Sequence, residues 1–391
     1  MNTREIFLKH VAQTSPSPLA LEISKAEGCY LEDVNGIRYL DLVGGISVAN
    51  VGHRHPRVLE AIRKQLDAYL HVMVYGEFVE SPQVKFAKAL TDLLPSTLNS
   101  VYFTNSGSEA IEGAMKLAKR INGRRNIFAF DKSYHGSTQG ALSIMGDEHW
   151  RNAFRPLLPC ISHYPFNGEE VLAAIDEDCC CVVVETIQAE AGVVAPSKEW
   201  LQKLRDKCRE TEALLVMDEV QAGFGRTGRL WGFEHFDVVP DILVLGKALG
   251  GGLPLGAFIS DQERMKLLSN DPVLGHITTF GGHPLSCAAG LAALEVLKEE
   301  DLVTQVAKKE RSFRQLLIHN KIREVRSFGL WFAIEFSSPE ENKKIIEKCL
   351  ARSVFIDWFL FTDSCMRISP PLTITSEELR HAAGVILQSI D

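Results

Sequence analysis

Short apolar runs alternate with amphipathic segments over the middle of the chain. Continuous apolar stretches of strand length occur at residues 101–103, 127–130, 181–185, 213–219 and 241–246. Between several of them, apolar residues recur at helical spacing, as they do over residues 108–120 and 198–210. Short apolar strands separated by helices are typical of a mostly parallel sheet that helices cover on both faces. The pattern therefore predicts an α/β fold, with this alternation beginning near residue 57.

The two ends of the chain have different patterns. Residues 28–42 form two alternating runs around Asn35-Gly36, a dipeptide that strongly favours a hairpin turn. Towards the C-terminus, helices and fewer strands are expected in mixed order. The helices are expected over 285–300, 302–318, 340–351 and 376–390, and the strands over 329–336 and 366–368. This mixture predicts a second, smaller α/β domain.

Composition narrows the class of protein. The chain has 391 residues, a hydrophobic fraction of 46% and a formal net charge of −8, which argues against a broad nucleic-acid surface. No apolar run has the length of a membrane span, and residues 1–15 lack a signal-peptide core, so we expect a cytoplasmic protein. The nine cysteines include no CxxC pair, and residues 179–181 open an apolar run. We therefore expect core cysteines, with no metal and no disulfide framework.

Polar or reactive residues follow five of the expected strands. They are the loop 104–108, the pair Tyr134-His135, Glu185, Asp218 and Lys247. In an open α/β sheet, ligands bind at the carboxyl ends of the strands. Loops are polar in general, which would explain any one of these residues, but a Lys, an Asp, a Glu and a Gly-Ser loop together predict one site.

The loop "NSGSEA" (residues 105–110) precedes an expected helix. Gly107 lets the backbone approach a ligand closely, and Ser108 can cap the helix. A helix N-terminus offers free N–H groups and a positive dipole end, which suit a phosphate. Taken alone, the loop would be more typical of an ordinary helix cap than of a phosphate site.

The segment "DEVQAGFGRTG" (residues 218–228) contains a GxGxxG pattern at Gly223, Gly225 and Gly228. This pattern binds dinucleotides when a helix follows it, and no clear helix follows here, so it favours a nicotinamide cofactor only weakly. Asp218 at the end of a buried strand needs a partner, and a protonated ring nitrogen would provide one.

Lys247 follows a buried strand and precedes a cluster of glycines. Most lysines are solvated, but partial burial would lower the pKa of this amine and make it nucleophilic. A lysine, a strand-end aspartate and a phosphate loop together predict pyridoxal 5′-phosphate: the lysine binds its aldehyde, the aspartate its pyridinium nitrogen and the loop its phosphate.

The motifs also carry a family resemblance that runs from about residue 15 to the C-terminus. The segments are "NSGSEA", "SYHGST", "ETIQAEAGV", "DEVQAGFGRTG", "LGKALGGGLPLGA" and "ITTFGGHPLSCAA". In this order they resemble class III pyridoxal-phosphate aminotransferases, and most of all those acting on acetylornithine, ornithine and 4-aminobutyrate. The resemblance implies fold type I, a homodimer and three parts: residues 1–55 contributing to a small domain, 56–284 forming the large cofactor domain and 285–391 the C-terminal small domain.

The resemblance implies a role for each matching position. Lys247 would bond to the cofactor aldehyde, and Asp218 would face the ring nitrogen. The other cofactor contacts that it implies are Gly107 and Ser108 at the phosphate, Tyr134 and Val220 on the two ring faces, Gln221 at the phenolic oxygen, Glu185 in the wall and Thr279 at the phosphate of the neighbouring subunit. The substrate residues that it implies are Arg367 for a carboxylate, Glu190 as the partner that releases Arg367, Ser137 and Thr278.

Four positions depart from the usual motifs, and Ser137 matters most. Relatives acting on acetylornithine or 4-aminobutyrate usually carry a carboxylate-binding Arg there. Ile46, in place of the Tyr of ornithine aminotransferases, weakly favours the acetylornithine branch. Thr186 and His283 replace the usual Pro and Asn.

These features predict an aminotransferase that moves an amino group from an acetylornithine- or ornithine-like donor to a 2-oxo acid, 2-oxoglutarate above all, by a ping-pong mechanism. Two other readings use the same residues: a class III decarboxylase or aminomutase, and a non-catalytic cofactor-binding relative. Intact Lys247 and Asp218 argue against the last one.

Overall fold

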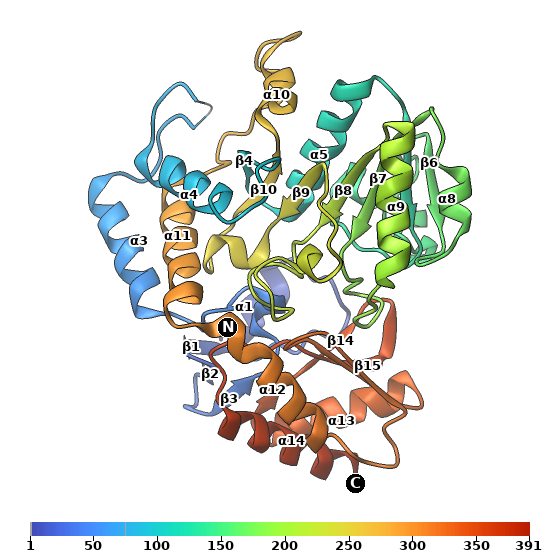
Figure 1. The fold of residues 1–391 in the computed structure, drawn as a ribbon. Helices are drawn as coiled ribbons and strands as arrows, with labels where there is room; N and C mark the ends of the chain where they lie inside the picture. The colour runs from blue at the N-terminus through green and yellow to red at the C-terminus, as the bar shows by residue number, and fades with distance from the viewer. Residues whose placement is uncertain (1, 75) are drawn as a thin grey trace.

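A seven-stranded sheet forms the centre of the computed structural model, which describes residues 2–74 and 76–391 (Figure 1). Its strand order is β4-β10-β9-β8-β7-β5-β6. The strands are β4 (Ser100–Thr104), β5 (Asn126–Phe130), β6 (Ile161–Tyr164), β7 (Cys179–Glu185), β8 (Leu214–Asp218), β9 (Ile242–Leu245) and β10 (Gly256–Ser260). Neighbours from β6 to β9 pair in parallel, and β10 runs antiparallel to β4 and β9. The predicted, mostly parallel sheet is confirmed, with β6 and β10 as additions.

Helices cover both faces of this sheet, because successive strand residues point to opposite sides. Val183 and Val216 pack into a core with α5 (Gly107–Asn122), whereas Val182 and Leu215 pack into a core with α9 (Lys198–Thr211). Cys179, Cys180 and Cys181 are fully buried, as their apolar setting predicts. Helix α11 (Pro284–Glu299) packs against α3 (Pro56–Ala68) and α4 (Ser81–Thr91) beside the sheet.

Two four-stranded sheets lie below the large one in Figure 1. The first joins β1 (Ile23–Glu27), β2 (Tyr30–Asp33) and β3 (Arg38–Asp41) to β13 (Val354–Phe355), which is parallel to β3. The β2–β3 pair turns at Asn35-Gly36, so the predicted hairpin is confirmed. Early and late parts of the chain thus share one sheet, although the division at residues 55 and 284 stays a prediction.

The second small sheet has the order β11-β12-β15-β14. Its strands are β11 (Glu324–Ser327), β12 (Phe332–Glu335), β14 (Asp357–Phe359) and β15 (Thr362–Ile368), and the helices around it are α12 (Leu302–Leu316), α13 (Pro339–Ala351) and α14 (Ser376–Ile390). The two-residue connection between β14 and β15 makes a tight hairpin whose second strand carries Arg367.

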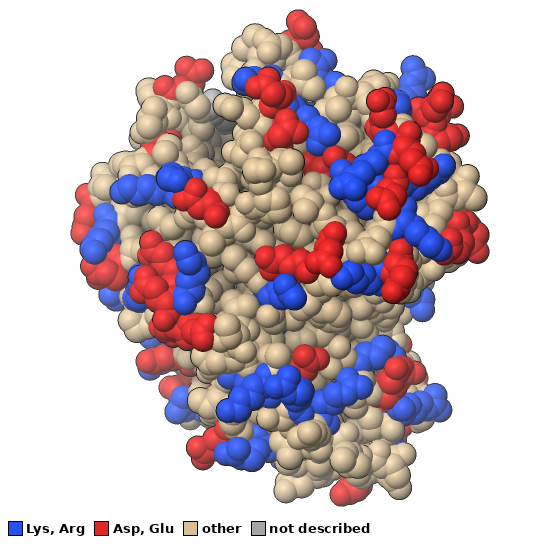
Figure 2. Space-filling model, viewed as in Figure 1, with Lys and Arg blue, Asp and Glu red and all other residues tan. Residues whose placement is uncertain are grey.

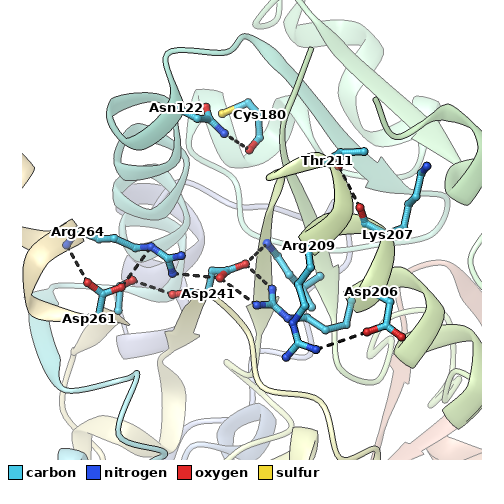
Figure 3. Close-up of polar contacts among 12 residues, drawn as sticks. Asn122, Cys180, Asp206, Lys207, Arg209, Thr211, Asp241, Asp261 and Arg264 are labelled. Atoms are coloured by element: carbon cyan, nitrogen blue, oxygen red, sulfur yellow. Dashed lines mark hydrogen bonds and ion pairs between the residues drawn. The ribbon is translucent and has the colours of Figure 1, made fainter. Parts of the chain in front are cut away.

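A cluster of charged residues links the large sheet to α9 at the N-terminal ends of the parallel strands, the edge opposite the carboxyl ends where the site is predicted. Asp241, immediately before β9, forms ion pairs with Arg205 of α9 and with Arg264, whose Nη1 lies 3.0 Å from it (Figure 3). The backbone N–H of Leu215 donates to the same carboxylate at 2.9 Å. These contacts keep the pKa of Asp241 below its ordinary value although burial acts in the opposite direction.

Surface charge is unevenly distributed on the face drawn in Figure 2. Lys and Arg gather over α12, which carries the exposed Lys308, Arg311 and Arg314, while both signs alternate near α9. No helix in the described part of the chain combines the length and the apolar character needed to cross a membrane.

Candidate active site

A cavity of about 420 Å³ lies where the strands β5, β7, β8 and β9 end. This volume is in the range of small-molecule sites. Nine of the predicted residues line it: Gly107, Ser108, Tyr134, Ser137, Glu185, Asp218, Val220, Gln221 and Lys247. The structure therefore brings most of the predicted set together at one edge of the sheet.

The N-terminus of α5 forms one wall of the cavity. Ser106 caps this helix by accepting a hydrogen bond from the N–H of Glu109 at 3.2 Å. The sequence suggested Ser108 as the cap, and this prediction is wrong. Ser108 lies inside the helix, and its Oγ is 2.8 Å from Oγ1 of Thr138. The first N–H groups of a helix have no partner within it and suit an anion.

Glycines keep this wall close to the cavity. A Cβ atom on Gly107 would lie 2.7 Å from Cγ2 of Val220, so no side chain fits between them. Gly136 has φ +125°, and a Cβ there would meet Oγ of Ser108 at 2.3 Å. A larger residue at either position would fill the space beside the helix N-terminus.

Asp218 ends β8 with its carboxylate held on both oxygens. Oδ2 lies 2.7 Å from Nδ1 of His135, and Oδ1 accepts from the N–H of Val220 at 2.9 Å. His135 is buried, and its Nε2 has no partner among the described residues. Sequence reasoning assigned no role to His135, although a buried acid that needs a partner was the available signal.

Lys247 follows β9 after one residue, Gly246, and begins a short 3-10 turn. Its backbone φ is +48°, in the left-handed region that few residues other than glycine adopt. No hydrogen bond of its amine is found within residues 2–74 and 76–391, and burial lowers its pKa against the opposing pull of Asp218. The cavity thus contains an amine that is easier to deprotonate than an ordinary lysine.

Glu185 at the end of β7 is fully occupied by backbone donors. It accepts from the N–H of Tyr134 at 2.9 Å and from the N–H of Ala189 at 2.8 Å. Burial, followed by the charge of Asp218, raises its pKa well above the ordinary value. Glu185 therefore fixes the backbone of Tyr134.

Gln221 also has a protein partner, since its Nε2 donates to Oγ of Ser47 at 3.2 Å.

Arg367 and Glu190 form a buried ion pair near the cavity, although they do not line it. Nη2 of Arg367 lies 2.6 Å from Oε2 of Glu190 and also donates to the carbonyl of Trp358 at 2.7 Å. Nε and Nη1 of Arg367 are buried and lack a partner among the residues that the structure describes. Both charges influence the pKa of Lys247, which places them within electrostatic reach of its amine.

The two threonines and Ser137 lie in different surroundings. Ser137 is exposed at the cavity, with its Oγ 3.3 Å from the hydroxyl of Tyr134. Thr278 accepts from Nδ2 of Asn105 at 2.9 Å and lines a second groove. Thr279 is exposed and does not belong to the cavity of its own chain.

The cavity fits pyridoxal 5′-phosphate on three counts. It offers helix N–H groups for a phosphate, a carboxylate for a protonated ring nitrogen and an unpartnered amine for an aldehyde. Because positions 107 and 136 carry glycine, no side chain fills the space beside the helix N-terminus, and that space stays open for the phosphate.

The model of the family described as aminotransferase class-III matches residues 11–390. The chain belongs to the class III aminotransferases. It is therefore an enzyme of the fold type I α/β class that depends on pyridoxal 5′-phosphate, as the resemblance predicted. Its substrates are accordingly an amine or amino acid and a 2-oxo acid.

Relatives of known name extend over the same length. The chain is 37% identical to an acetylornithine aminotransferase of Methanopyrus kandleri, with 100% of this chain and 99% of the relative covered. It is 39% identical to a LysW-aminoadipate semialdehyde/glutamate semialdehyde transaminase of Sulfurisphaera tokodaii, with 82% of each covered. An ornithine aminotransferase structure from Toxoplasma gondii, described with partial occupancy of PLP, superposes with a TM-score of 0.91 at 31% identity over 99% of this chain and 94% of that one.

Proposed function

We propose that this class III aminotransferase moves an amino group from an acetylornithine- or ornithine-like donor to 2-oxoglutarate by a ping-pong mechanism. The observation that carries the proposal is the unpartnered amine of Lys247, which shares one cavity with Asp218 and the N-terminus of α5. The names of the relatives support the donor class.

Lys247 would hold the cofactor and move the proton. When bound, pyridoxal 5′-phosphate supplies an aldehyde that accepts the donor amine and a ring that accepts electrons from the carbon. A lowered pKa leaves more of the Lys247 amine neutral near pH 7, so that it can take a proton from the substrate carbon and return it. Its position close to the end of a buried strand, with only Gly246 between, would fix the place of the amine that carries this proton.

Asp218 would keep the ring nitrogen protonated, and His135 would act on Asp218 as a positioning residue. The contact of 2.7 Å between His135 and Asp218 holds the carboxylate in one orientation. Tyr134 and Val220, which both line the cavity, would contact the two ring faces, and Gln221 would leave Ser47 to reach the phenolic oxygen. Gly107 and Ser108 would bind the phosphate through the helix N-terminus.

Arg367 would bind the α-carboxylate of glutamate after Glu190 leaves it. A bidentate contact with a carboxylate uses Nη2 together with Nε or Nη1. Nε and Nη1 are available, whereas Nη2 donates to Glu190 and Trp358. Glu190 therefore competes with a substrate carboxylate, and a donor without an α-carboxylate leaves the ion pair intact. Ser137 would contact the far part of the substrate, and Thr278, which lies outside the cavity of its own chain, would do so in the site of the neighbouring subunit.

A homodimer would complete each site. Thr279 lies outside the cavity of its own chain and would reach the phosphate of the neighbouring subunit's cofactor. Exposed apolar side chains close to it in the chain support an interface, because Val273 and Phe280 leave 73% and 52% of their surface exposed. An apolar groove of about 420 Å³ beside Thr278 would be covered by the second copy. The cytoplasmic location stays a prediction.

An assay of amino transfer tests the proposal. The holoenzyme is incubated with N-acetylornithine or ornithine and 2-oxoglutarate, and glutamate formation is measured while both concentrations vary. The proposal predicts glutamate and parallel double-reciprocal lines, which ping-pong kinetics give. Release of CO₂ without glutamate would contradict it and indicate a decarboxylase.

A further inference from the structure

Two arginines lie in one row across the small sheet β11-β12-β15. In the antiparallel register, Arg326 of β11 is paired with Ala333 of β12, and Ala333 is paired with Arg367 of β15. Side chains of directly paired residues point to the same face of a sheet. Arg326 and Arg367 therefore project from the same face, with the small side chain of Ala333 between them.

Both arginines hold the same loop, residues 189–193, which follows β7 and carries Glu190. Arg367 takes the carboxylate of Glu190, while Nε of Arg326 donates to the carbonyl of Gly192 at 2.9 Å. A Cβ on Gly192 would lie 2.9 Å from Nη2 of Arg326 and 3.7 Å from Cβ of Ala333. The loop thus rests directly on the row of the two arginines.

Arg326 is itself fixed. Its Nη1 donates to Glu335 at 2.7 Å and to Glu324, and its Nη2 donates to Sγ of Cys365 at 3.1 Å. Four partners on three strands and one loop leave the guanidinium a single orientation. It therefore ties the loop to the sheet that carries Arg367.

The backbone and the side chain of Glu190 are held by different groups. Its carbonyl accepts from the N–H of Phe361 at 3.1 Å, next to the anchor that Arg326 makes at Gly192. Its carboxylate accepts from Arg367 and from the N–H of Leu360 at 2.8 Å. The carboxylate can therefore leave Arg367 by rotation of its side chain while the backbone stays in place.

We propose that Arg326 is a positioning residue that sets how strongly Glu190 competes for Arg367. By fixing the loop backbone, it keeps the carboxylate of Glu190 within reach of Arg367, and so raises the concentration at which a substrate carboxylate displaces it. Discrimination between donors with and without an α-carboxylate then depends on a residue that contacts neither substrate nor cofactor. The inference rests on the proposed role of Arg367.

Binding of glutarate, a dicarboxylate that does not react, tests this inference by titration calorimetry on the holoenzyme. Arg326→Gln removes the anchor, and Gly192→Ala pushes the loop away from Arg326 while leaving the ion pairs of Arg326 in place. In both variants we expect glutarate to bind about three- to tenfold more tightly, the change that one lost hydrogen bond brings. The inference would be overturned if, in both folded variants, glutarate binds with a Kd within twofold of the parent value or binds more weakly than in the parent.

A double-mutant cycle separates positioning from a general structural effect. In a Glu190→Ala background, Arg326→Gln should no longer change the Kd of glutarate, because the competitor is already gone. Persistence of the full effect in that background would also overturn the inference. Arg323→Gln, which removes an exposed cation next to β11, is the matched control and should leave the Kd unchanged.

Failure of the proposed function gives a different result. Arg367→Gln should abolish glutarate binding if Arg367 receives a carboxylate. Glutarate binding that survives Arg367→Gln would remove that role from the proposed function, and the inference about Arg326 with it.

Discussion

Lys247 is the residue on which turnover depends most directly in the proposed mechanism. Lys247→Ala removes the cavity's amine and should abolish steady-state transamination, because no other side chain lining the cavity is an amine. The variant should still fold and can hold the cofactor without a covalent bond. The exposed Lys64, changed to Ala, serves as a control that should keep parental activity. Near-normal transamination by Lys247→Ala without added amine would contradict the assignment.

Asp218→Asn tests the charge at the ring nitrogen. The amide keeps the shape of the side chain but cannot favour a protonated nitrogen, so we expect a loss of about 10²-fold or more in kcat, or ~3 kcal/mol. Unfolding measured by circular dichroism should be close to that of the parent. A kcat within a few-fold of the parent would remove Asp218 from this role.

Ser137 should determine how the enzyme treats donors with a distant carboxylate. A serine hydroxyl in place of an arginine fork costs such a donor roughly 1.5–3 kcal/mol, or about 10–150-fold. 4-Aminobutyrate should therefore react weakly, whereas glutamate can use Arg367, and Ser137→Arg should raise kcat/KM for 4-aminobutyrate. A parental kcat/KM for 4-aminobutyrate at or above that of every other amine tested would contradict this expectation.

At the level of residues, the sequence predicted which side chains gather but not how each is partnered. Nine residues identified in this way line the cavity. Strand ends and glycines indicated Gly107, Ser108, Tyr134, Glu185, Asp218 and Lys247, and the family resemblance added Ser137, Val220 and Gln221. The cap at Ser106 and the contact of His135 with Asp218 were missed, because two serines flank Gly107 and because a buried histidine has no pattern of its own.

At the level of elements, most strands with continuous apolar runs were predicted, although β10 was missed, and several strands without such runs were missed as well. β7 and β8 are buried on both faces and therefore read as unbroken apolar runs. β6 and β11 have polar or half-buried residues, and β13 and β14 are only two and three residues long. Their pairing depends on contacts between distant parts of the chain, which periodicity does not encode.

The Asp241 cluster should stabilise the junction of β8, β9 and α9 in a pH-dependent way (Figure 3). Asp241→Asn leaves Arg205 and Arg264 without their carboxylate, and we expect a loss of about 3 kcal/mol in the free energy of unfolding at pH 7. Because the folded-state pKa of Asp241 lies below that of the unfolded chain, about 3.9, this contribution is complete above that value and is lost as pH falls through the folded-state pKa.

Denaturant titrations of parent and Asp241→Asn at several pH values between 7 and 3 measure this difference. Asp206→Asn is the control, since Asp206 pairs with Arg209 at the surface and should contribute little (Figure 3). An equal loss of stability for Asp241→Asn at pH 7 and at pH 3 would contradict the electrostatic explanation.

At the level of the whole molecule, subunit mixing tests whether two chains build each site. A Thr279→Glu chain and a Lys247→Ala chain should each be nearly inactive alone. A hybrid dimer has one site with both lesions and one with neither, so activity should return on mixing. If mass spectrometry verifies subunit exchange and activity does not return, that result would count against the proposed dimer.

The most direct test of the proposed site is chemical identification of the lysine that holds the cofactor. Borohydride reduction of the holoenzyme fixes the cofactor to that lysine, and peptide mass spectrometry then locates the added mass. We predict a single modified peptide with the mass on Lys247, the residue whose burial lowers its pKa at the end of β9. Modification of a different lysine, with Lys247 recovered unmodified, would contradict the proposed site.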